Sequence, residues 1–355
     1  MKTLAYFNDT ERCYHWGCAG TSGTIKEILA ERGYALTCVP HHQIAQCSQP
    51  PETLQELANP APQFLESSRP LIDIIRAHEY LVINGEGTPH GFSSPPRTLL
   101  CLMYLAKAMG KNVQIINHSC YPNDHQHLPD SPASQLYRDV YAQIDYVAVR
   151  EHITHARLGD MGVKATLAFD CLPLYIARHY AALPPSAKTR HIILATSSAL
   201  RAEGLGAIVS YLHGMMAQGY TPVALSGAAA EPAVDELMFV KMLSAQLPEL
   251  THVVAQTMTE WLQYLQSAAI LVSGRFHYTI AAAAMGTPCV VFDANTPKNI
   301  ALSEDVGLPP PLSYTAPNLE NILHARTQAA LALPPDGARL SALWGERAMK
   351  NFAQL

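Results

Sequence analysis

Glu86 is a residue whose sequence surroundings suggest that it could take part in chemistry. It stands between Gly85 and Gly87, directly after the apolar run YLVIN (80–84), which is predicted to be a buried strand. Glycines on both sides leave the carboxylate little shielded at the strand tip, where it could act as a general acid or base or bind sugar hydroxyls. A solvated loop carboxylate is the alternative. The other candidate residues of this tip are Asn84 and His90.

A cationic pair follows a second predicted strand, AILV. Arg275 and His277 stand at the start of an alanine-rich helix, with Gly274 beside them. Guanidinium donors, an imidazole and the positive end of a helix dipole together suit a phosphate or a carboxylate. The alternative is a structural role for Arg275, such as an ion pair with Asp170.

Three further segments place polar residues between a strand and a helix. HWGCAGTSGT (15–24) has small residues that let backbone amides approach an anion, although it is neither a Walker loop nor a complete GxGxxG motif, and an ordinary capped turn is the alternative. DANTPK (293–298) could also be a simple Asx turn with a surface lysine. The third segment is Arg150-Glu151-His152, which follows the apolar run YVAV (146–149). The candidate binding residues of these segments are His15, Trp16, Gly17, Thr21, Ser22, Arg150, Asn295, Thr296 and Lys298.

Short apolar runs alternate with helix-like segments along most of the chain. A helix is predicted over 22–33, with Ser22 as its N-cap and Gly33 as its end, and an irregular excursion over 48–63. Such alternation predicts an α/β fold with parallel sheets covered by helices on both faces. The predicted strands are 2–7, 34–39, 80–84, 112–117, 145–149, 165–169, 191–196, 221–225, 251–255, 269–273 and 288–292.

A break in this alternation at 173–189 predicts a linker between two domains. We therefore expect two facing Rossmann-like domains, residues 1–180 and 190–335, and a C-terminal helix within 336–355 that packs back across their junction. The first domain is the expected acceptor side and the second the expected donor side. Ligands of such sheets bind beyond the carboxyl ends of the strands, so the candidate residues are expected to line a cleft between the domains.

Composition limits the classes of protein that the chain can be. Of its 355 residues, 48% are hydrophobic and 15% are charged, which supports two sizeable cores, and a net charge of −5 gives no basic field for nucleic acid or an anionic membrane. The eight cysteines form no CxxC and the sixteen histidines no metal-type spacing, so reduced, buried thiols and no metal are expected. Without a signal or spanning segment, the sequence predicts a cytoplasmic protein.

Six of these segments, in order over about residues 13–308, resemble motifs of the polysaccharide pyruvyl transferase family. One departure concerns His15, which stands where a subgroup of that family has asparagine. The matching elements are an Asn-Trp-Gly-Cys type turn (15–18), a Gly-Glu-Gly tip (84–88), an Arg-Glu pair (150–151), a Gly-Arg-aromatic-His element (274–277), Gly-Thr-Pro (286–288) and Asn-Thr-x-Lys (295–298).

The resemblance implies a fold similar to the GT-B glycosyltransferases and a reaction without cofactor or metal. Phosphoenolpyruvate would be the co-substrate and a saccharide, free or lipid-linked, the acceptor, giving a pyruvate ketal across two hydroxyls. A lipid-linked acceptor would bring the enzyme to the inner face of the membrane. His277 is expected to donate a proton and Glu86 to orient or deprotonate the acceptor, although these roles could be exchanged. Arg275, Arg150 and Lys298 would balance the donor's charges.

Two rival functions remain at this point. A GT-B glycosyltransferase with a nucleotide-activated donor, such as a CMP-linked keto-deoxy sugar, could use the same cations to hold its phosphate. A non-catalytic glycan-binding protein of the same fold is the second rival, and the presence of Glu86, Arg275 and His277 together argues against it.

Overall fold

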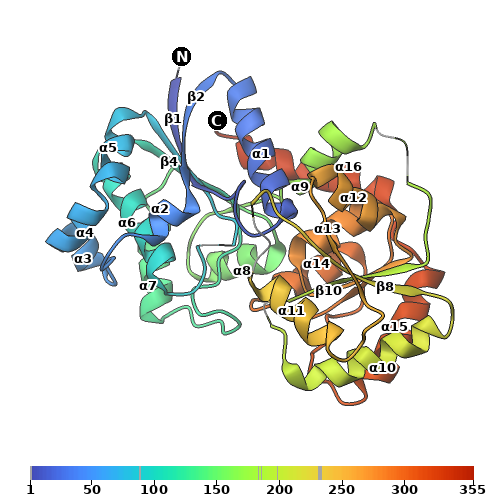
Figure 1. The fold of residues 1–355 in the computed structure, drawn as a ribbon. Coiled ribbons are helices and arrows are strands. Elements are labelled where there is room, and N and C mark those ends of the chain that lie inside the picture. The colour runs from blue at the N-terminus through green and yellow to red at the C-terminus, as the bar shows by residue number, and fades with distance from the viewer. Residues whose placement is uncertain (1, 88, 183, 185, 198, 231–233) are drawn as a thin grey trace. The chain divides into compact units, whose positions relative to one another are not determined.

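The computed structural model describes residues 2–87, 89–182, 184, 186–197, 199–230 and 234–355 (Figure 1). These residues form two compact units. The first unit comprises the residues up to Thr10, Ser22–Cys171 and Glu346–Leu355, and the second comprises Glu11–Thr21 and Leu172–Gly345. Each unit is built on its own parallel sheet, which confirms the predicted α/β fold class.

The first unit contains a six-stranded sheet in the order β2-β1-β3-β4-β5-β6, and all neighbouring strands are parallel. The order reverses at β1, because β2 lies on one side of it and β3 to β6 follow on the other. Ligands of open α/β sheets bind beyond the carboxyl ends of the strands at such a reversal. The strands are β1 (Lys2–Asp9), β2 (Tyr34–Pro40), β3 (Tyr80–Asn84), β4 (Asn112–His118), β5 (Tyr146–Val149) and β6 (Thr166–Leu167).

Alternate residues of these strands belong to one core. Ala5 and Phe7 of β1 and Leu81 and Ile83 of β3 are buried in the same cluster as the apolar residues 99–103 of α6. The predicted excursion at 48–63 is not wholly irregular, because it contains α3 and the beginning of α4. The helices that lie wholly in this unit are α2 (His41–Ala45), α3 (Leu54–Ala58), α4 (Pro62–Ser67), α5 (Arg69–Ala77), α6 (Ser94–Ala108), α7 (Pro132–Tyr141), α8 (His152–Asp160) and the 3-10 turn η3 (Lys350–Phe352).

The second unit contains a five-stranded sheet in the order β11-β10-β7-β8-β9, again with every neighbouring pair parallel. Its order reverses at β7, which lies between β10 and β8. Helices α10 (Leu205–Met216) and α15 (Leu319–Ala332) pack together on one side of this sheet, and α12 (Met258–Ser267) and α13 (Phe276–Ala284) pack together on the other (Figure 1). The strands are β7 (His191–Ala195), β8 (Thr221–Ser226), β9 (Thr251–Val254), β10 (Ile270–Ser273) and β11 (Cys289–Val291).

A local sequence signal fixes the start of α12 (Met258–Ser267) in this unit. Thr257 begins α12 with a capping box: its side chain accepts a hydrogen bond from the backbone N–H of Glu260, whose carboxylate accepts from the backbone of Gln256.

No described helix has the length and hydropathy that crossing a bilayer requires. The helices are α9 (Leu172–Tyr175), η1 (Ile176–Tyr180), η2 (Ala202–Gly204), α10 (Leu205–Met216), α11 (Val234–Ser244), α12 (Met258–Ser267), α13 (Phe276–Ala284), α14 (Lys298–Val306) and α15 (Leu319–Ala332).

Two helices contribute residues to both units, α1 (Trp16–Glu31) and α16 (Gly337–Met349). The predicted start of the first of them at Ser22 is wrong, because the helix begins six residues earlier. The backbone N–H groups of Cys18 and Ala19 already donate to the carbonyl of His15, over 3.0 and 3.2 Å. The small residues of this segment therefore extend the helix instead of forming a loop.

Candidate active-site residues

Glu86 lies where the first sheet reverses its order, just beyond the carboxyl ends of β1 and β3. Its side chain is buried, with 2% exposed, and its Oε2 accepts a hydrogen bond of 2.7 Å from the hydroxyl of Thr10. The side-chain amide of Asn84 donates to that hydroxyl over 3.2 Å, and its Oδ1 accepts from the backbone of Glu86 over 3.2 Å. Glu86 is thus a positioned carboxylate, and the solvated-loop alternative is wrong.

Gly85 is required by the close approach of His118. A Cβ atom at position 85 would lie 2.4 Å from the Cβ of His118 and 2.7 Å from its Cα. The imidazole is held at both nitrogens, because Nδ1 lies 3.2 Å from the Gly85 carbonyl and Nε2 lies 2.7 Å from the hydroxyl of Tyr141. Burial lowers the pKa of His118 to about 3, so this histidine is neutral and supports the loop that carries Glu86.

We expect Gly85→Ala to destabilise the protein by about 1–3 kcal/mol, the usual cost of forcing an extra methyl group into a packed site. His118 cannot yield without losing one of its two partners. Gly159→Ala in α8 is the matched control, because a Cβ there meets nothing within 4 Å. Denaturant unfolding of both variants checks the prediction, and equal stability of the two would contradict it.

The remaining candidates near the first reversal differ in their surroundings. Ser22 lies beside the end of β1, where its hydroxyl is 2.8 Å from the hydroxyl of Tyr6 and donates to the Asp9 carboxylate over 2.8 Å. His90 is partly exposed, and its Nδ1 lies 3.7 Å from an Asp124 oxygen. Gly87 adopts a positive φ of 59°. Thr88, the last residue of the tip, lies outside the described residues.

Arg150 follows β5 in the first unit and is almost completely buried. Its Nη1 donates to the Asp170 carboxylate over 2.8 Å, and its Nε donates to the Ser119 hydroxyl over 2.7 Å. The neighbouring Glu151 caps α8 by accepting a hydrogen bond of 2.8 Å from the backbone of Thr154. Asp170, the residue considered as a partner for Arg275, is therefore paired with Arg150.

Gly274 and Arg275 follow β10, next to the reversal of the second sheet at β7. A Cβ atom at position 274 would lie 2.1 Å from the Cβ of Ser197, which follows β7, so only glycine fits. The side-chain amide of Asn299 donates to the Gly274 carbonyl over 2.9 Å, and the backbone N–H of Arg275 donates to the Ser273 hydroxyl over 2.9 Å. The backbone that carries Arg275 is thus firmly held.

The guanidinium of Arg275 faces two carboxylates of α11. Its Nη2 donates to Asp235 over 2.6 Å, while its Nε lies 3.8 Å from Oε1 of Glu236 and has no hydrogen-bond partner among the described residues. The side chain is 15% exposed. Arg275 is therefore oriented by its own unit, with its Nε buried next to Glu236 and a small part of its side chain exposed.

Glu236 is a buried acid that the sequence gave no reason to select. It stands in the first turn of α11, where an acidic residue ordinarily complements the helix dipole at the surface, yet its side chain is only 3% exposed. Burial raises the pKa of Glu236 to about 7, against the opposing effect of Arg275, and the nearby Asp235 raises it further. Glu236 can therefore exchange a proton near neutral pH beside Arg275.

Glu236 also predicts a pH dependence of stability. Its folded pKa of about 7 exceeds its ordinary value of 4.5, so the folded state binds more protons in this window and stability falls as pH rises through it. At 1.36 kcal/mol per pKa unit, the loss is about 3 kcal/mol. The Glu236→Gln side chain cannot titrate. We therefore expect the free energy of unfolding of this variant, relative to that of the wild type, to rise by about 3 kcal/mol between pH 4.5 and pH 8. Unfolding at both pH values checks this, and a constant difference would contradict it.

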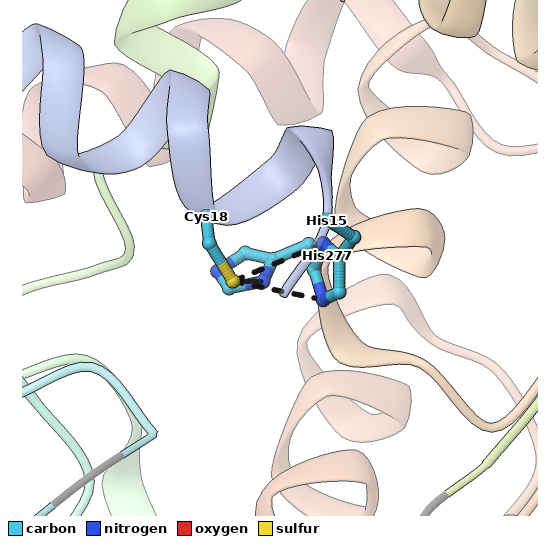
Figure 2. A group of neighbouring side chains, drawn as sticks. All are labelled: His15, Cys18 and His277. Carbon is cyan, nitrogen blue, oxygen red and sulfur yellow. Dashed lines mark hydrogen bonds between the residues drawn. The ribbon is translucent and has the colours of Figure 1, made fainter. Parts of the chain in front are cut away.

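His277 is the second residue of α13, two residues after Arg275, and it lies against His15 and Cys18 at the start of α1 (Figure 2). Its Nδ1 is 3.9 Å from Sγ of Cys18, and Sγ is 3.7 Å from Nε2 of His15. All three side chains are buried and belong to the second unit. The structure thus brings His15, which the sequence assigned to the acceptor or loop group, next to the expected proton donor His277, and adds Cys18, which had been selected only for its motif.

The Asn295 segment forms the predicted turn between β11 and α14. Lys298, the first residue of α14, donates to Oδ1 of Asn295 over 3.4 Å. The Thr296 side chain is buried, and its hydroxyl has no hydrogen-bond partner among the described residues. This turn follows β11, the strand that neighbours β10, so it lies on the same carboxyl edge of the sheet as Arg275.

Solved structures with the same fold are sugar-metabolising enzymes. The UDP-GlcNAc 2-epimerase of Methanocaldococcus jannaschii is similar over 99% of both chains, with a TM-score of 0.59 and 12% identity. That of Neisseria meningitidis has a TM-score of 0.55 and 10% identity over 99% of this chain and 100% of its own. The sucrose-phosphate synthase of Thermosynechococcus elongatus is similar over 100% of both chains, with a TM-score of 0.52 and 14% identity. At such identities the likeness shows the fold alone.

The two parallel sheets and these neighbours define an α/β protein of the GT-B type, as expected. Within that class, the family model for polysaccharide pyruvyl transferase matches residues 39–296. The chain therefore belongs to the polysaccharide pyruvyl transferase family, a family of transferases that act on polysaccharides, which confirms the resemblance drawn from its motifs. No curated protein sequence matches it closely enough to count as a relative.

Proposed function

We propose that the chain transfers the pyruvyl group of phosphoenolpyruvate to two hydroxyls of a saccharide, forming a cyclic ketal and releasing phosphate. Family membership supports the acceptor class. The observation that carries the choice of donor is Arg275 followed by His277 at the start of α13, which places a partly exposed guanidinium beyond the carboxyl end of β10. An anionic donor that also needs a proton suits this pair.

The second unit is the proposed donor side. Phosphoenolpyruvate carries a carboxylate and a phosphate, and Arg275 and Lys298 supply positive charge on one edge of the sheet. The backbone at Gly274, the amide of Asn295 and the buried hydroxyl of Thr296 add polar groups there. Arg150, in the first unit, is a further proposed contact, although its ion pair with Asp170 gives it a structural role as well.

The proposed reaction begins with a proton from His277 to the methylene carbon of phosphoenolpyruvate, which becomes a methyl group. The neighbouring carbon then has oxocarbenium character, and one sugar hydroxyl adds to it and loses its proton. The carbon–oxygen bond to phosphate breaks, the second hydroxyl adds and loses its proton, and the ketal closes. One of the two released protons restores His277 and the other leaves with phosphate or solvent, so no oxidant, reductant or metal enters the balance.

Glu86 is the proposed base for the acceptor hydroxyl. Its carboxylate is fixed by Thr10 and Asn84 at the reversal of the first sheet, which is a suitable placement for orienting a hydroxyl. The remaining proposed acceptor or loop contacts are His15, Trp16, Gly17, Thr21, Ser22, Asn84, Gly85, Gly87 and His90. The acceptor can be a free or a lipid-linked saccharide under this proposal.

Phosphate release tests the proposal against glycosyl transfer from a nucleotide sugar. Glycosyl transfer from a nucleotide sugar is the second candidate function. The fold favours it, because similar solved structures are described with UDP or UDP-GlcNAc. The purified protein would be given phosphoenolpyruvate, UDP-sugars or CMP-sugars, each with a panel of mono- and oligosaccharides. We expect acceptor-dependent phosphate release from phosphoenolpyruvate alone. Acceptor-dependent release of UDP or CMP without phosphate release would contradict the proposal.

A further inference from the structure

We infer that His15, Cys18 and His277 form a binding site for one divalent transition-metal ion of the zinc class. Each residue offers one ligand atom, and these atoms all lie within 4.8 Å of one another (Figure 2). Two imidazoles and a thiol are the ligands that zinc prefers, whereas magnesium and calcium require oxygen ligands. The inference stands on this geometry and does not depend on the proposed function.

The distances agree with a tetrahedral ion. Zinc bonds of about 2.3 Å to sulfur and 2.0–2.1 Å to nitrogen place the two ligand atoms about 3.6 Å apart. Sγ of Cys18 lies 3.7 Å from Nε2 of His15 and 3.9 Å from Nδ1 of His277. Sγ also lies 3.9 Å from Nδ1 of His15, so binding an ion would require a rotation of the His15 imidazole that turns Nε2 toward the sulfur.

The backbone holds the three ligands in place. His15 directly precedes α1, Cys18 lies in its first turn, and a Cβ atom on the intervening Gly17 would lie 2.3 Å from the Cβ of His277. Trp16 anchors this turn, since its backbone N–H donates to the Gly227 carbonyl over 3.2 Å and its indole N–H to the Ala255 carbonyl over 2.9 Å. The close contact at Gly17 thus brings ligands that are distant in the sequence to one point.

The surroundings favour a charged thiolate ligand. Cys18 and His277 lie in the first turns of α1 and α13, and the positive end of a helix dipole stabilises negative charge. Three protein ligands leave one of four tetrahedral positions for water or a substrate oxygen, as in catalytic zinc sites. The sequence showed no metal-type spacing because His277 is 259 residues from Cys18.

Metal binding and the proposed proton transfer exclude one another at His277. An imidazole bound to a metal through Nδ1 cannot also carry a proton on that nitrogen, so it cannot be the imidazolium donor. A direct measurement of metal binding therefore tests the site separately from catalysis, and loss of activity on metal loading would link the two.

Cobalt(II) is the probe, because it takes zinc sites and its thiolate complexes absorb light. We expect the full chain, stripped with a chelator, to bind one equivalent of cobalt with a thiolate-to-metal charge-transfer band that zinc abolishes. Cys18→Ser should lose the band. His15→Asn should weaken binding by more than the roughly 10–100-fold that loss of an outer hydrogen-bond partner costs. Cys38→Ser, which changes an exposed cysteine, should leave the band unchanged.

The absence of a charge-transfer band in the wild-type protein would overturn the inference. So would a band that survives Cys18→Ser, because another cysteine would then be the ligand. Circular dichroism and thermal melting establish that each variant is folded. If Cys18→Ser does not fold, His15→Asn decides alone, and unchanged cobalt affinity in that variant would overturn the site.

Discussion

Arg275→Ala is expected to weaken phosphoenolpyruvate binding by about 10–150-fold, the equivalent of about 1.5–3 kcal/mol for a hydrogen bond to a charged group. The guanidinium is the positioned cation at the start of α13, and its side chain is partly exposed. Removing it also leaves Asp235 as an uncompensated negative charge that repels the donor. Titration calorimetry with phosphoenolpyruvate measures the effect.

Arg190→Ala is the matched control for this prediction. Arg190 directly precedes β7 in the same unit, at the opposite edge of the sheet, where it stacks on Tyr220 and donates to the carbonyls of Gln218 and Gly219. The Arg190→Ala substitution removes the same charge as Arg275→Ala and leaves the carboxyl ends of the strands unchanged. Equal loss of affinity in both variants would mean that net charge, and not the site at Arg275, governs binding.

Glu86→Gln is expected to retain phosphoenolpyruvate binding and to lower turnover by about 10²–10⁴-fold, the usual contribution of a general base. The amide keeps the shape of the side chain and can still accept the hydrogen bond from Thr10. It cannot remove a proton from an acceptor hydroxyl. Measuring donor affinity and phosphate release on the same preparation separates the two effects.

Glu79→Gln serves as the control for Glu86. Glu79 is exposed and directly precedes β3, the strand that Glu86 follows, so the same charge is removed at the other edge of the sheet. Wild-type turnover in Glu86→Gln would assign the base to another group. Loss of donor binding in that variant would instead place Glu86 with the donor, which exchanges the roles proposed for the two units.

Periodicity and turn residues predicted most of the fold. The apolar runs at 80–84 and 191–196 agree with β3 and β7, because a buried parallel strand is apolar throughout and ends at a polar residue. The start of α1 was misplaced, since glycine and cysteine ahead of Ser22 are poor helix signals that packing overrides. Helix α15 (Leu319–Ala332) was not predicted, although Asn318 before it is a favoured N-cap residue type; in the structure its side chain makes no cap hydrogen bond.

Sequence also predicted where the candidate residues lie better than what surrounds them. Strand ends carry Glu86 and Arg275 because parallel strands gather polar residues at one edge. The residues that were missed, Glu236 and His118, are significant through burial and through partners that are distant in the sequence. Neither the burial of a side chain nor its distant partners can be obtained from the local spacing of residues. The same limit concealed the group formed by His15, Cys18 and His277.

The most direct test of the central claim is the melting temperature of the wild-type protein with phosphoenolpyruvate, CMP or UDP. A ligand that binds only the folded state stabilises it by about 2.7 kcal/mol at a hundredfold excess over its dissociation constant. The account predicts an increase with phosphoenolpyruvate alone, and a much smaller increase in Arg275→Ala at the same ligand concentration. An increase with CMP or UDP and none with phosphoenolpyruvate would contradict it, and would make the chain a nucleotide-sugar enzyme.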